Sequence, residues 1–327
     1  MTAPTVAAPR LLPWLLRVHR PALYVWTGLL VLLGGTLLWL WGPLTDAAAE
    51  AWRQYNACAT GGVCRYDQDA ILRYKDVYLY ASFAVLAVPF LVAAWAGGAL
   101  TGRELEHGTA QLAWSQGISP ARWLTAKLAV PAALVGAGTG LLVLLHHLTW
   151  SAGRSRVDNT KSWFSTETFY ANGPLVVALA LAGLAAGALA GLLLRRSLAA
   201  LGAAAVAVAA LWTALRFALP HLWPTATGVS GLDGGPGYPG LLVDQGLVTA
   251  TGAHIDNPGC GSTATAECRE LFDRLDAVGY YTDYHPASHY WPLQLTATGA
   301  VLAAAALMTL IAFRLLRRRT ADKGAAR

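Results

Sequence analysis

The sequence has few charged residues and lacks several motifs, and each absence excludes a class of protein. Only 13% of its 327 residues are charged, against roughly 25% in an ordinary soluble domain. It contains no Gly-x-x-x-x-Gly-Lys-Ser/Thr segment, so it has no phosphate-binding loop with which to hydrolyse ATP. It also contains no His-Glu-x-x-His motif of a zinc hydrolase. We therefore expect a membrane protein that is not itself an enzyme.

Long apolar runs take the place of the missing charges. Hydrophobic residues make up 55% of the chain, and the mean hydropathy is +0.43. A helix of about 20 apolar residues spans a bilayer and satisfies its own backbone hydrogen bonds there. The predicted spans are Leu23–Trp41, Leu79–Leu100, Leu128–His146, Pro174–Leu194, Ser197–Leu219 and Pro292–Leu315.

Acidic residues are missing from the interior of all these spans. Proton- and sodium-coupled transporters usually need such groups inside the membrane, so this class is disfavoured. Arg216 lies within a span, but one turn from its end, where the side chain can reach the interface. No layer of polar residues at one depth is evident in the sequence, which argues against a membrane-embedded enzyme.

Lys and Arg are distributed unevenly between the two sides of the predicted bundle. The N-terminus, the loops after spans 2 and 4, and the C-terminal tail carry 14 basic and 3 acidic residues, whereas the other side carries 10 basic and 15 acidic residues. Positive charge marks the cytoplasmic side. We therefore predict a multi-pass protein of the cytoplasmic membrane with both termini inside. We expect the first apolar run to be retained, because it is too long for a typical signal peptide.

Four cysteines, Cys58, Cys64, Cys260 and Cys268, fall in the predicted outer loops. Disulfides are expected in an oxidising compartment, and local pairs, Cys58–Cys64 and Cys260–Cys268, are the simplest of the three connectivities. A zinc site is the alternative, but no Cys-x-x-Cys spacing supports it. His285 and His289 are four residues apart with Pro286 between them, and we interpret them as interfacial histidines with no metal.

The two long outer loops are expected to contain some structure. In the first, about Thr45–Val77, the segments Ala47–Asn56 and Ala70–Tyr80 look helical. The last, Pro220–Trp291, begins with a Gly/Pro-rich stretch, Gly228–Gly240, that we expect to be flexible. Helical spacing of apolar residues then predicts a helix over Thr263–Val278, capped by Gly279. We interpret this loop as a disulfide-pinned lid with an aromatic belt; a ligand-binding domain is the alternative.

The loop between spans 2 and 3 carries the most specific pattern. Gly108 should end the helix leaving span 2, and Thr109 can cap a short helix over Ala110–Gln116. Ser119 can then cap the next helix with Pro120 at its first position. The result is a short cytoplasmic helix tied to two spans, which suits a docking surface. An ordinary charged turn is the alternative.

This loop contains, in order, Arg-Glu-x-Glu-x-Gly-Thr, a short helix, Ser-Pro-x-Arg and a Lys before the next span. In this order it resembles the loop of the type-2 ABC transporter permease family, above all of its actinobacterial members. The resemblance implies that this loop, about residues 101–127, couples the permease to a separate ATP-binding subunit. The residues that it assigns to coupling are Arg103, Glu104, Glu106, Gly108, Thr109, Ser119, Pro120, Arg122 and Lys127. It also implies that residues 9–21 form an amphipathic elbow helix at the membrane surface.

Small residues recur at intervals of four in two spans, which allows helices to approach closely. They are Gly136, Gly140, Gly183, Gly187 and Gly191. Packing within one subunit and packing against a second subunit both remain open. Because six spans are half of what an ABC exporter uses, the resemblance implies a second six-span permease, identical or paralogous.

The predicted fold is an all-α membrane protein. Its segments are a cytoplasmic N-terminus (1–22), spans 1–5 (23–219), an extracellular loop (220–291), span 6 (292–316) and a basic tail (317–327). The expected function is the permease subunit of an ABC exporter for a hydrophobic or amphipathic substrate. ATP and Mg would bind the partner ATPase, with no cofactor in this chain; membrane lipids are expected partners and nucleic acid is not. The alternative is a membrane sensor or assembly protein that uses its outer loop without transport.

Overall fold

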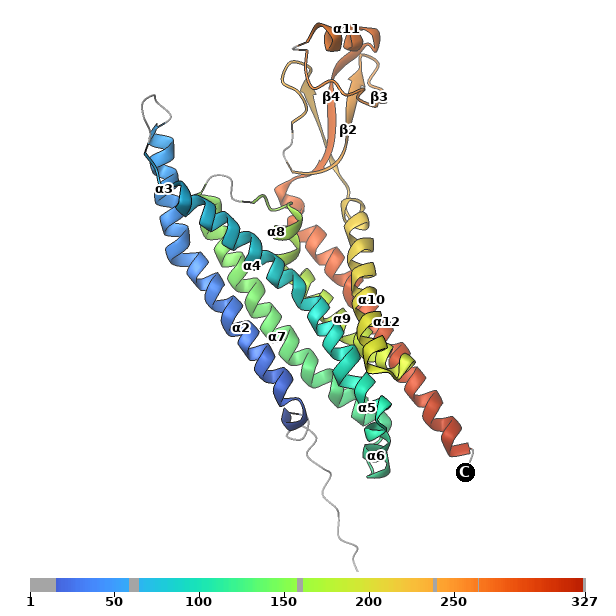
Figure 1. Cartoon of the computed structure of the whole chain (residues 1–327). Coiled ribbons are helices and arrows are strands. Elements are labelled where there is room, and N and C mark those ends of the chain that lie inside the picture. The colour runs from blue at the N-terminus through green and yellow to red at the C-terminus, as the bar shows by residue number, and fades with distance from the viewer. Residues whose placement is uncertain (1–15, 59–64, 158–160, 238–239, 264, 326–327) are drawn as a thin grey trace, which may run out of the picture. The chain divides into compact units, whose positions relative to one another are not determined.

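A computed structural model describes residues 16–58, 65–157, 161–237, 240–263 and 265–325, with side chains as far as Thr320 (Figure 1). The described chain is mostly helical and divides into two compact units. The first unit comprises residues 1–161, 170–212 and 298–327, and the second comprises residues 162–169 and 213–297.

Within the described part of the chain, six helical segments are long and apolar enough to cross a membrane, which confirms the six predicted spans. Most of them extend beyond the predicted limits, because polar turns at both ends continue the same helices. The segments are Arg20–Ala57, Gln68–Glu106, Pro120–Arg154, Pro174–Leu194, Ser197–His221 and Ala287–Thr320.

The first two segments are helices interrupted by wider π-helical turns. The first consists of α2 (Arg20–Trp39), a π turn (Leu40–Leu44) and α3 (Thr45–Ala57). Pro43 lies inside that turn, where its missing N–H disrupts the regular hydrogen bonding. The second consists of α4 (Gln68–Trp95), a π turn (Ala96–Gly102) and α5 (Arg103–Glu106). The helices expected in the first outer loop are thus continuous with spans 1 and 2.

The remaining helices follow in chain order. The short helix α6 (Thr109–Ser115) precedes α7 (Pro120–Arg154), and α9 (Pro174–Leu194) has the predicted bounds of span 4. They are followed by α10 (Ser197–Ala218) and the 3-10 turn Leu219–His221, while α12 (Tyr290–Ala325) ends the described chain. α9 is the best-buried span, with 78% of its apolar window inside the protein, so it forms the centre of the bundle.

The second unit contains a four-stranded antiparallel sheet, so the all-α prediction was wrong. The strands β1 (Ala226–Gly231), β2 (Leu241–Thr249), β3 (His254–Ile255) and β4 (Ala277–His285) lie in the order β1-β4-β2-β3. β4 is the long inner strand, and its sequence Ala-Val-Gly-Tyr-Tyr-Thr-Asp-Tyr-His is rich in the aromatic and β-branched residues that favour strands. The unit also holds the short turn Ala287–His289, and α8 (Thr166–Ala171) crosses between the two units.

Two further predictions in this loop were wrong. The helix expected over Thr263–Val278 is only α11 (Ala266–Arg274), and Gly279 is not its cap but part of β4. Asp276 adopts a left-handed conformation (φ 52°) that separates helix from strand. Part of the Gly/Pro-rich stretch forms β1 rather than a flexible linker. The apolar residues that were assigned to one helix are divided between α11 and β4. In so short a run, periodicity alone cannot distinguish a helix from a strand.

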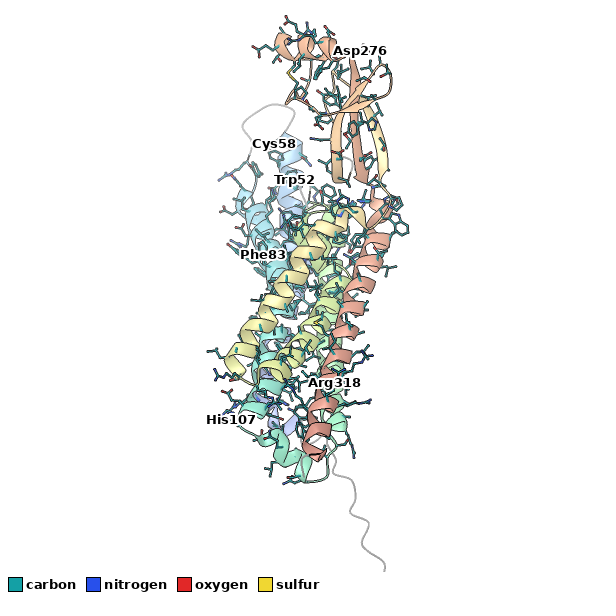
Figure 2. All side chains as sticks on the ribbon, turned by 90° about the vertical axis from the view of Figure 1, so that its right-hand side faces the viewer. Trp52, Cys58, Phe83, His107, Asp276 and Arg318 are labelled. Atoms are coloured by element: carbon teal, nitrogen blue, oxygen red, sulfur yellow. A yellow bond between two sulfur atoms is a disulfide. The ribbon has the colours of Figure 1, made fainter. Side chains whose placement is uncertain are left out.

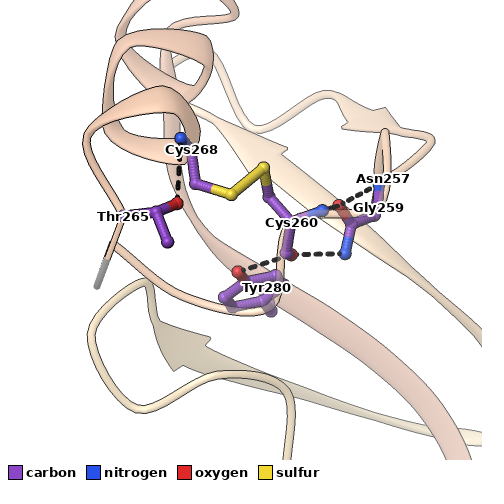
Figure 3. Close-up of a disulfide and its surroundings, with 6 residues drawn as sticks. All are labelled: Asn257, Gly259, Cys260, Thr265, Cys268 and Tyr280. Carbon is purple, nitrogen blue, oxygen red and sulfur yellow. Dashed lines mark hydrogen bonds between the residues drawn. A yellow bond between two sulfur atoms is a disulfide. The ribbon is translucent and has the colours of Figure 1, made fainter.

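A disulfide joins Cys260 to Cys268 and closes one end of the sheet unit (Figure 3). Next to it, Leu247, Phe272 and Tyr280 form a small buried core. The Tyr280 hydroxyl donates to the carbonyl oxygen of Cys260 at 3.0 Å. The predicted Cys58–Cys64 pair includes Cys64, which lies outside the described residues, as does most of the predicted elbow helix (9–15).

Replacing Cys260 and Cys268 with serine should loosen the sheet unit. The disulfide spans a sequence separation of 8 residues, and closing so short a loop contributes about 2–3 kcal/mol in the chain-entropy model. We expect faster proteolytic cleavage within residues 240–277 and unchanged cleavage within α4–α7. Cleavage at the wild-type rate would show that the sheet and its core hold the unit without the disulfide.

Candidate functional site

The loop between α5 and α6 turns sharply at a glycine. Gly108 has φ 73°, a left-handed conformation that suits glycine and ends α5. Thr109 was expected to cap α6, but Gly108 occupies that position and Thr109 is the first helical residue. The Thr109 hydroxyl donates to the carbonyl oxygen of Glu104 at 3.3 Å. The threonine therefore ties the new helix back to the old one.

The start of α7 matches the sequence prediction. The Ser119 hydroxyl accepts the backbone N–H of Arg122 at 3.3 Å, and Pro120 occupies the first helical position. Ser119 thus satisfies one of the free N–H groups at the helix start, and Pro120 has none to satisfy. α6 is consequently held between two sharply defined turns, at Gly108 and at Gly117–Ser119.

A buried ion pair lies directly behind this loop. Lys127 on α7 places its Nζ 2.6 Å from Oε1 of Glu104 on α5. The Lys127 side chain is completely buried, and the Glu104 side chain is 14% exposed. The second carboxylate oxygen of Glu104 accepts the Trp123 Nε1–H at 3.2 Å. The sequence motif indicated Glu104 and Lys127 separately but not as a pair, and it gave no indication of a role for Trp123.

The ammonium group of Lys127 has two further acceptors. It donates to the carbonyl oxygen of Leu100 at 3.0 Å and lies 3.4 Å from Nε2 of His19. Burial, followed by the nearby charge of Lys127, lowers the pKa of His19 to about 4. The imidazole is therefore neutral at pH 7 and can accept this hydrogen bond. In this way Lys127 joins the segment before α2, the end of span 2 and the start of α7.

Glu106 connects the same loop to α10. Its Oε2 accepts the backbone N–H of Ser197, the first residue of α10, at 2.8 Å. A carboxylate at a helix N-terminus satisfies a free N–H and interacts favourably with the helix dipole. The turn between α9 and α10 is therefore attached to the loop between α5 and α6.

α6 packs one face against the bundle and leaves the other exposed. Ala110 belongs to a buried cluster with Trp123, Leu124 and residues of α9 and α12, and Trp114 packs on that cluster. The rings of Trp114 and Trp123 meet edge to face, with centroids 5.7 Å apart. On the opposite face Leu112 is 59% exposed. The outer face of α6 therefore exposes one large apolar side chain next to the polar residues of the loop.

The exposed α6 surface lies at the same end of the bundle as the basic end of α12. Figure 2 shows His107, next to α6, and Arg318 of α12 at this end, with Trp52 and Cys58 toward the other. Of the predicted coupling residues, Arg103, Glu106, Thr109, Ser119 and Arg122 are exposed here, whereas Lys127 is buried. The predicted set thus contains both an exposed surface and the buried pair behind it.

The predicted glycine stripes occupy two different environments. A Cβ on Gly183 or Gly187 would meet the backbone of span 2 at 2.6 Å, and Gly191 lies against Thr101 and Gly102. These three glycines therefore pack α9 against span 2 within the chain. A Cβ on Gly136 or Gly140 would meet nothing within 4 Å, whereas Gly138 packs against Trp26.

A buried polar cluster inside the bundle was missed by sequence analysis. His146 of α7 lies 2.9 Å from the Ser82 hydroxyl and 3.3 Å from Oδ1 of Asn172, and all three residues are buried. Nearby on α7, Thr149 donates to the carbonyl oxygen of Leu37 at 3.2 Å. Polar side chains of two spans and of the turn before α9 therefore meet in the folded chain, although the sequence shows no polar layer across the spans. Isolated polar residues in separate spans gave no signal that they meet.

The described residues contain no group of three or more His, Cys, Asp and Glu side chains placed to hold a metal ion. His285 and His289 do meet, with their Nδ1 atoms 3.2 Å apart. The pair joins the end of β4 to the 3-10 turn Ala287–His289, so the two histidines do not share a helix face. Nε2 of His285 lies 2.9 Å from the carbonyl oxygen of Pro220, which ties this pair to the end of span 5.

Comparison with known proteins identifies a family for the helical part of the chain. No curated protein and no solved structure matches the sequence. A family described as "ABC-2 membrane transporter related" matches residues 27–219, which cover spans 1–5 and the loop that carries α6. Because the match extends over more than half of the chain, the protein belongs to the ABC-2 membrane transporter related family.

Proposed function

We propose that this chain is the permease subunit of an ATP-binding cassette exporter that moves a hydrophobic or amphipathic substrate across the cytoplasmic membrane. Membership of the ABC-2 related family and six apolar helices support the permease assignment. A separate subunit would bind ATP and Mg and hydrolyse the nucleotide, because this sequence has no phosphate-binding loop. Both termini would be cytoplasmic, on the side that carries 14 of the 24 Lys and Arg residues.

The observation that carries the proposal is the attachment of α6. Its inner face is held by Trp114 and by the cluster around Trp123, while its outer face exposes Leu112. A helix held this firmly can transmit a force instead of yielding to it. The Glu104–Lys127 pair would pass movement of α6 to span 3, and the Glu106–Ser197 contact would pass it to α10. We infer that α6 is the coupling helix.

Replacing Leu112 with glutamate should abolish binding of the ATPase subunit. The substitution puts a charge into the centre of the proposed apolar contact, and a central hot-spot residue contributes at least about 2 kcal/mol to an interface. We expect the ATPase recovered with the tagged permease, measured by quantitative mass spectrometry after mild detergent extraction, to fall by more than about tenfold.

Leu72→Glu is the matched control, because Leu72 is 46% exposed and lies at the opposite end of span 2. This variant should recover the ATPase as the wild type does. Both variants should show wild-type abundance in the membrane. Equal recovery of the ATPase with Leu112→Glu and with wild type would contradict the assignment of α6.

A second six-span permease should complete the transporter, either as a copy of this chain or as a paralogue. Gly136 and Gly140 face open space in the single chain and are available to such a subunit. A sensor or assembly role is the second candidate, and the sheet unit with its own buried core favours it. An ATPase that never copurifies, under conditions that keep the permease intact, would favour that role.

A further inference from the structure

An open groove of about 390 Å³ runs along the first unit between α7, α9 and α12. Leu181, Leu184 and Ala185 of α9 contribute to its lining, together with residues of the two flanking helices. The volume falls within the roughly 300–1,000 Å³ of small-molecule sites. The flanking residues of α7 and α12 are leucines, alanines and Phe313, with Thr125 and Thr309 as the polar exceptions.

The groove presents an apolar surface throughout. Its two hydroxyl groups are satisfied within their own helices, since Thr125 donates to the carbonyl oxygen of Ala121 and Thr309 to that of Ala305. Among the described residues, no acidic or basic side chain lines the groove. Such a lining suits a hydrocarbon chain, and it offers no partner to a polar ligand.

The groove adjoins the cluster that holds α6. Leu128 and Phe313, which line the groove, also pack against that cluster, whose buried residues include Trp123 of α7 and Leu316 of α12. Arg122 is adjacent to Trp123, and Arg317 is adjacent to Leu316. The two arginines therefore neighbour this cluster in the sequence, one on each flanking helix.

Helix periodicity places both arginines along the rims of the groove. Arg122 is three residues before Thr125, and Arg317 is four residues after Phe313, so each lies one turn further along the same side of its helix. Both side chains are exposed, and among the described side chains neither forms an ion pair. An apolar groove thus ends in two unpaired cations.

We propose that this groove binds one anionic phospholipid, with an acyl chain along α9 and the phosphate group between Arg122 and Arg317. Basic sites between helices at the membrane surface are suited to anionic headgroups, and the groove supplies the apolar half of the site. The inference does not depend on the ATPase, so it stands or falls separately from the proposed function. It places a lipid directly against the cluster that supports α6.

The test is native mass spectrometry of the full-length protein in mild detergent, titrated with phosphatidylglycerol or with phosphatidylcholine of the same acyl chains. Wild type should bind one phosphatidylglycerol in preference to phosphatidylcholine. The double variant Arg122→Gln/Arg317→Gln should lose this preference, with about fivefold weaker binding for each arginine removed. Ala306→Phe, which fills the groove from an exposed position, should weaken binding of both lipids.

Two matched variants control for charge and bulk. Arg318→Gln removes a neighbouring arginine that points about 100° away from Arg317 around the helix, and Ala207→Phe adds the same bulk to an exposed position on α10. Both should bind phosphatidylglycerol as wild type does. The proposal is overturned if Arg318→Gln alone also weakens phosphatidylglycerol binding about fivefold, because the total positive charge of this region, and not the position of each arginine, would then explain the preference. It is also overturned if Ala306→Phe breaks a dimer while lipid binding stays unchanged, because a second subunit would then fill the groove.

Discussion

Replacing Glu104 with alanine should destabilise the protein by about 3–5 kcal/mol, because the charge of Lys127 would remain buried without a partner. Lys127 is completely buried, and its other acceptors, the Leu100 carbonyl and the His19 ring, are neutral. Trp123 would also lose the acceptor for its indole N–H. The measurement is the unfolding temperature of the purified protein in detergent, together with its yield from membranes.

Replacing Lys127 should lower the stability less than replacing Glu104. Lys127→Met leaves a carboxylate that is partly exposed and still accepts from Trp123, so it should destabilise less than Glu104→Ala. The double variant Glu104→Gln/Lys127→Met should lie close to wild type, because replacing both members of a buried pair is often neutral. Glu106→Ala is the control on the same turn, and losing its cap of α10 should cost about 0.5–2 kcal/mol.

A separate measurement connects this pair to function. If the pair transmits movement from α6 to α7, the double variant should retain the ATPase subunit and wild-type stability. For the wild-type complex, reconstitution into vesicles should raise the rate of ATP hydrolysis. The complex with the double variant should lose most of this increase. If Glu104→Ala proves as stable as the double variant, burying Lys127 without Glu104 does not lower the stability of the protein. The attachment of α6 would then depend on Trp114 and Trp123 alone.

The helical part of the fold could be predicted because bilayer-spanning helices are determined locally. A run of about 20 apolar residues makes a span wherever it occurs, and Pro174–Leu194 was predicted to the residue. The caps at Gly108 and Ser119 are similarly local, since backbone conformation and one side chain define each. The position of α6 in the sequence followed from these signals, with an error of one residue at each end.

The sheet unit could not be predicted in the same way. Its strands pair residues far apart in sequence, such as Val229 with Tyr281, and short strands leave only weak periodicity. The Leu271, Phe272 and Leu275 spacing fits a helix, and α11 does use it. Nothing local shows that the following residues turn at Asp276 and cross the sheet as β4.

In the candidate site, too, the local features could be predicted from the sequence and the tertiary contacts could not. Residue types at the exposed loop, such as Glu106 and Arg122, were selected from the motif. The contacts behind the loop depend on how α5, α7 and the segment before α2 pack together, and they join residues 19 to 108 positions apart. Glu104, Lys127, Trp123 and His19 therefore meet through tertiary structure, which a single sequence does not encode in any short pattern.

Replacing Gly187 with alanine should separate α9 from span 2 and strongly destabilise the bundle. The added Cβ would lie 2.5 Å from Cβ of Ala96 and 2.6 Å from the backbone nitrogen of Gly97. Neither atom belongs to a flexible side chain, so the two helices must move apart. Overpacking of this kind costs typically about 1–3 kcal/mol, and α9 is the most buried of the six spans. The unfolding temperature in detergent measures the effect.

Gly136→Ala provides the control, because a Cβ there meets nothing within 4 Å in the single chain. In detergent it should be neutral or stabilise by up to about 1 kcal/mol, since alanine favours a helix over glycine. A Gly187→Ala variant as stable as wild type would contradict the close packing of α9 on span 2. If Gly136→Ala instead weakens a two-permease assembly while the single chain keeps its stability, the glycines of α7 face the second subunit. The glycines of α9 would then pack helices within the chain, and those of α7 would pack against the second permease subunit.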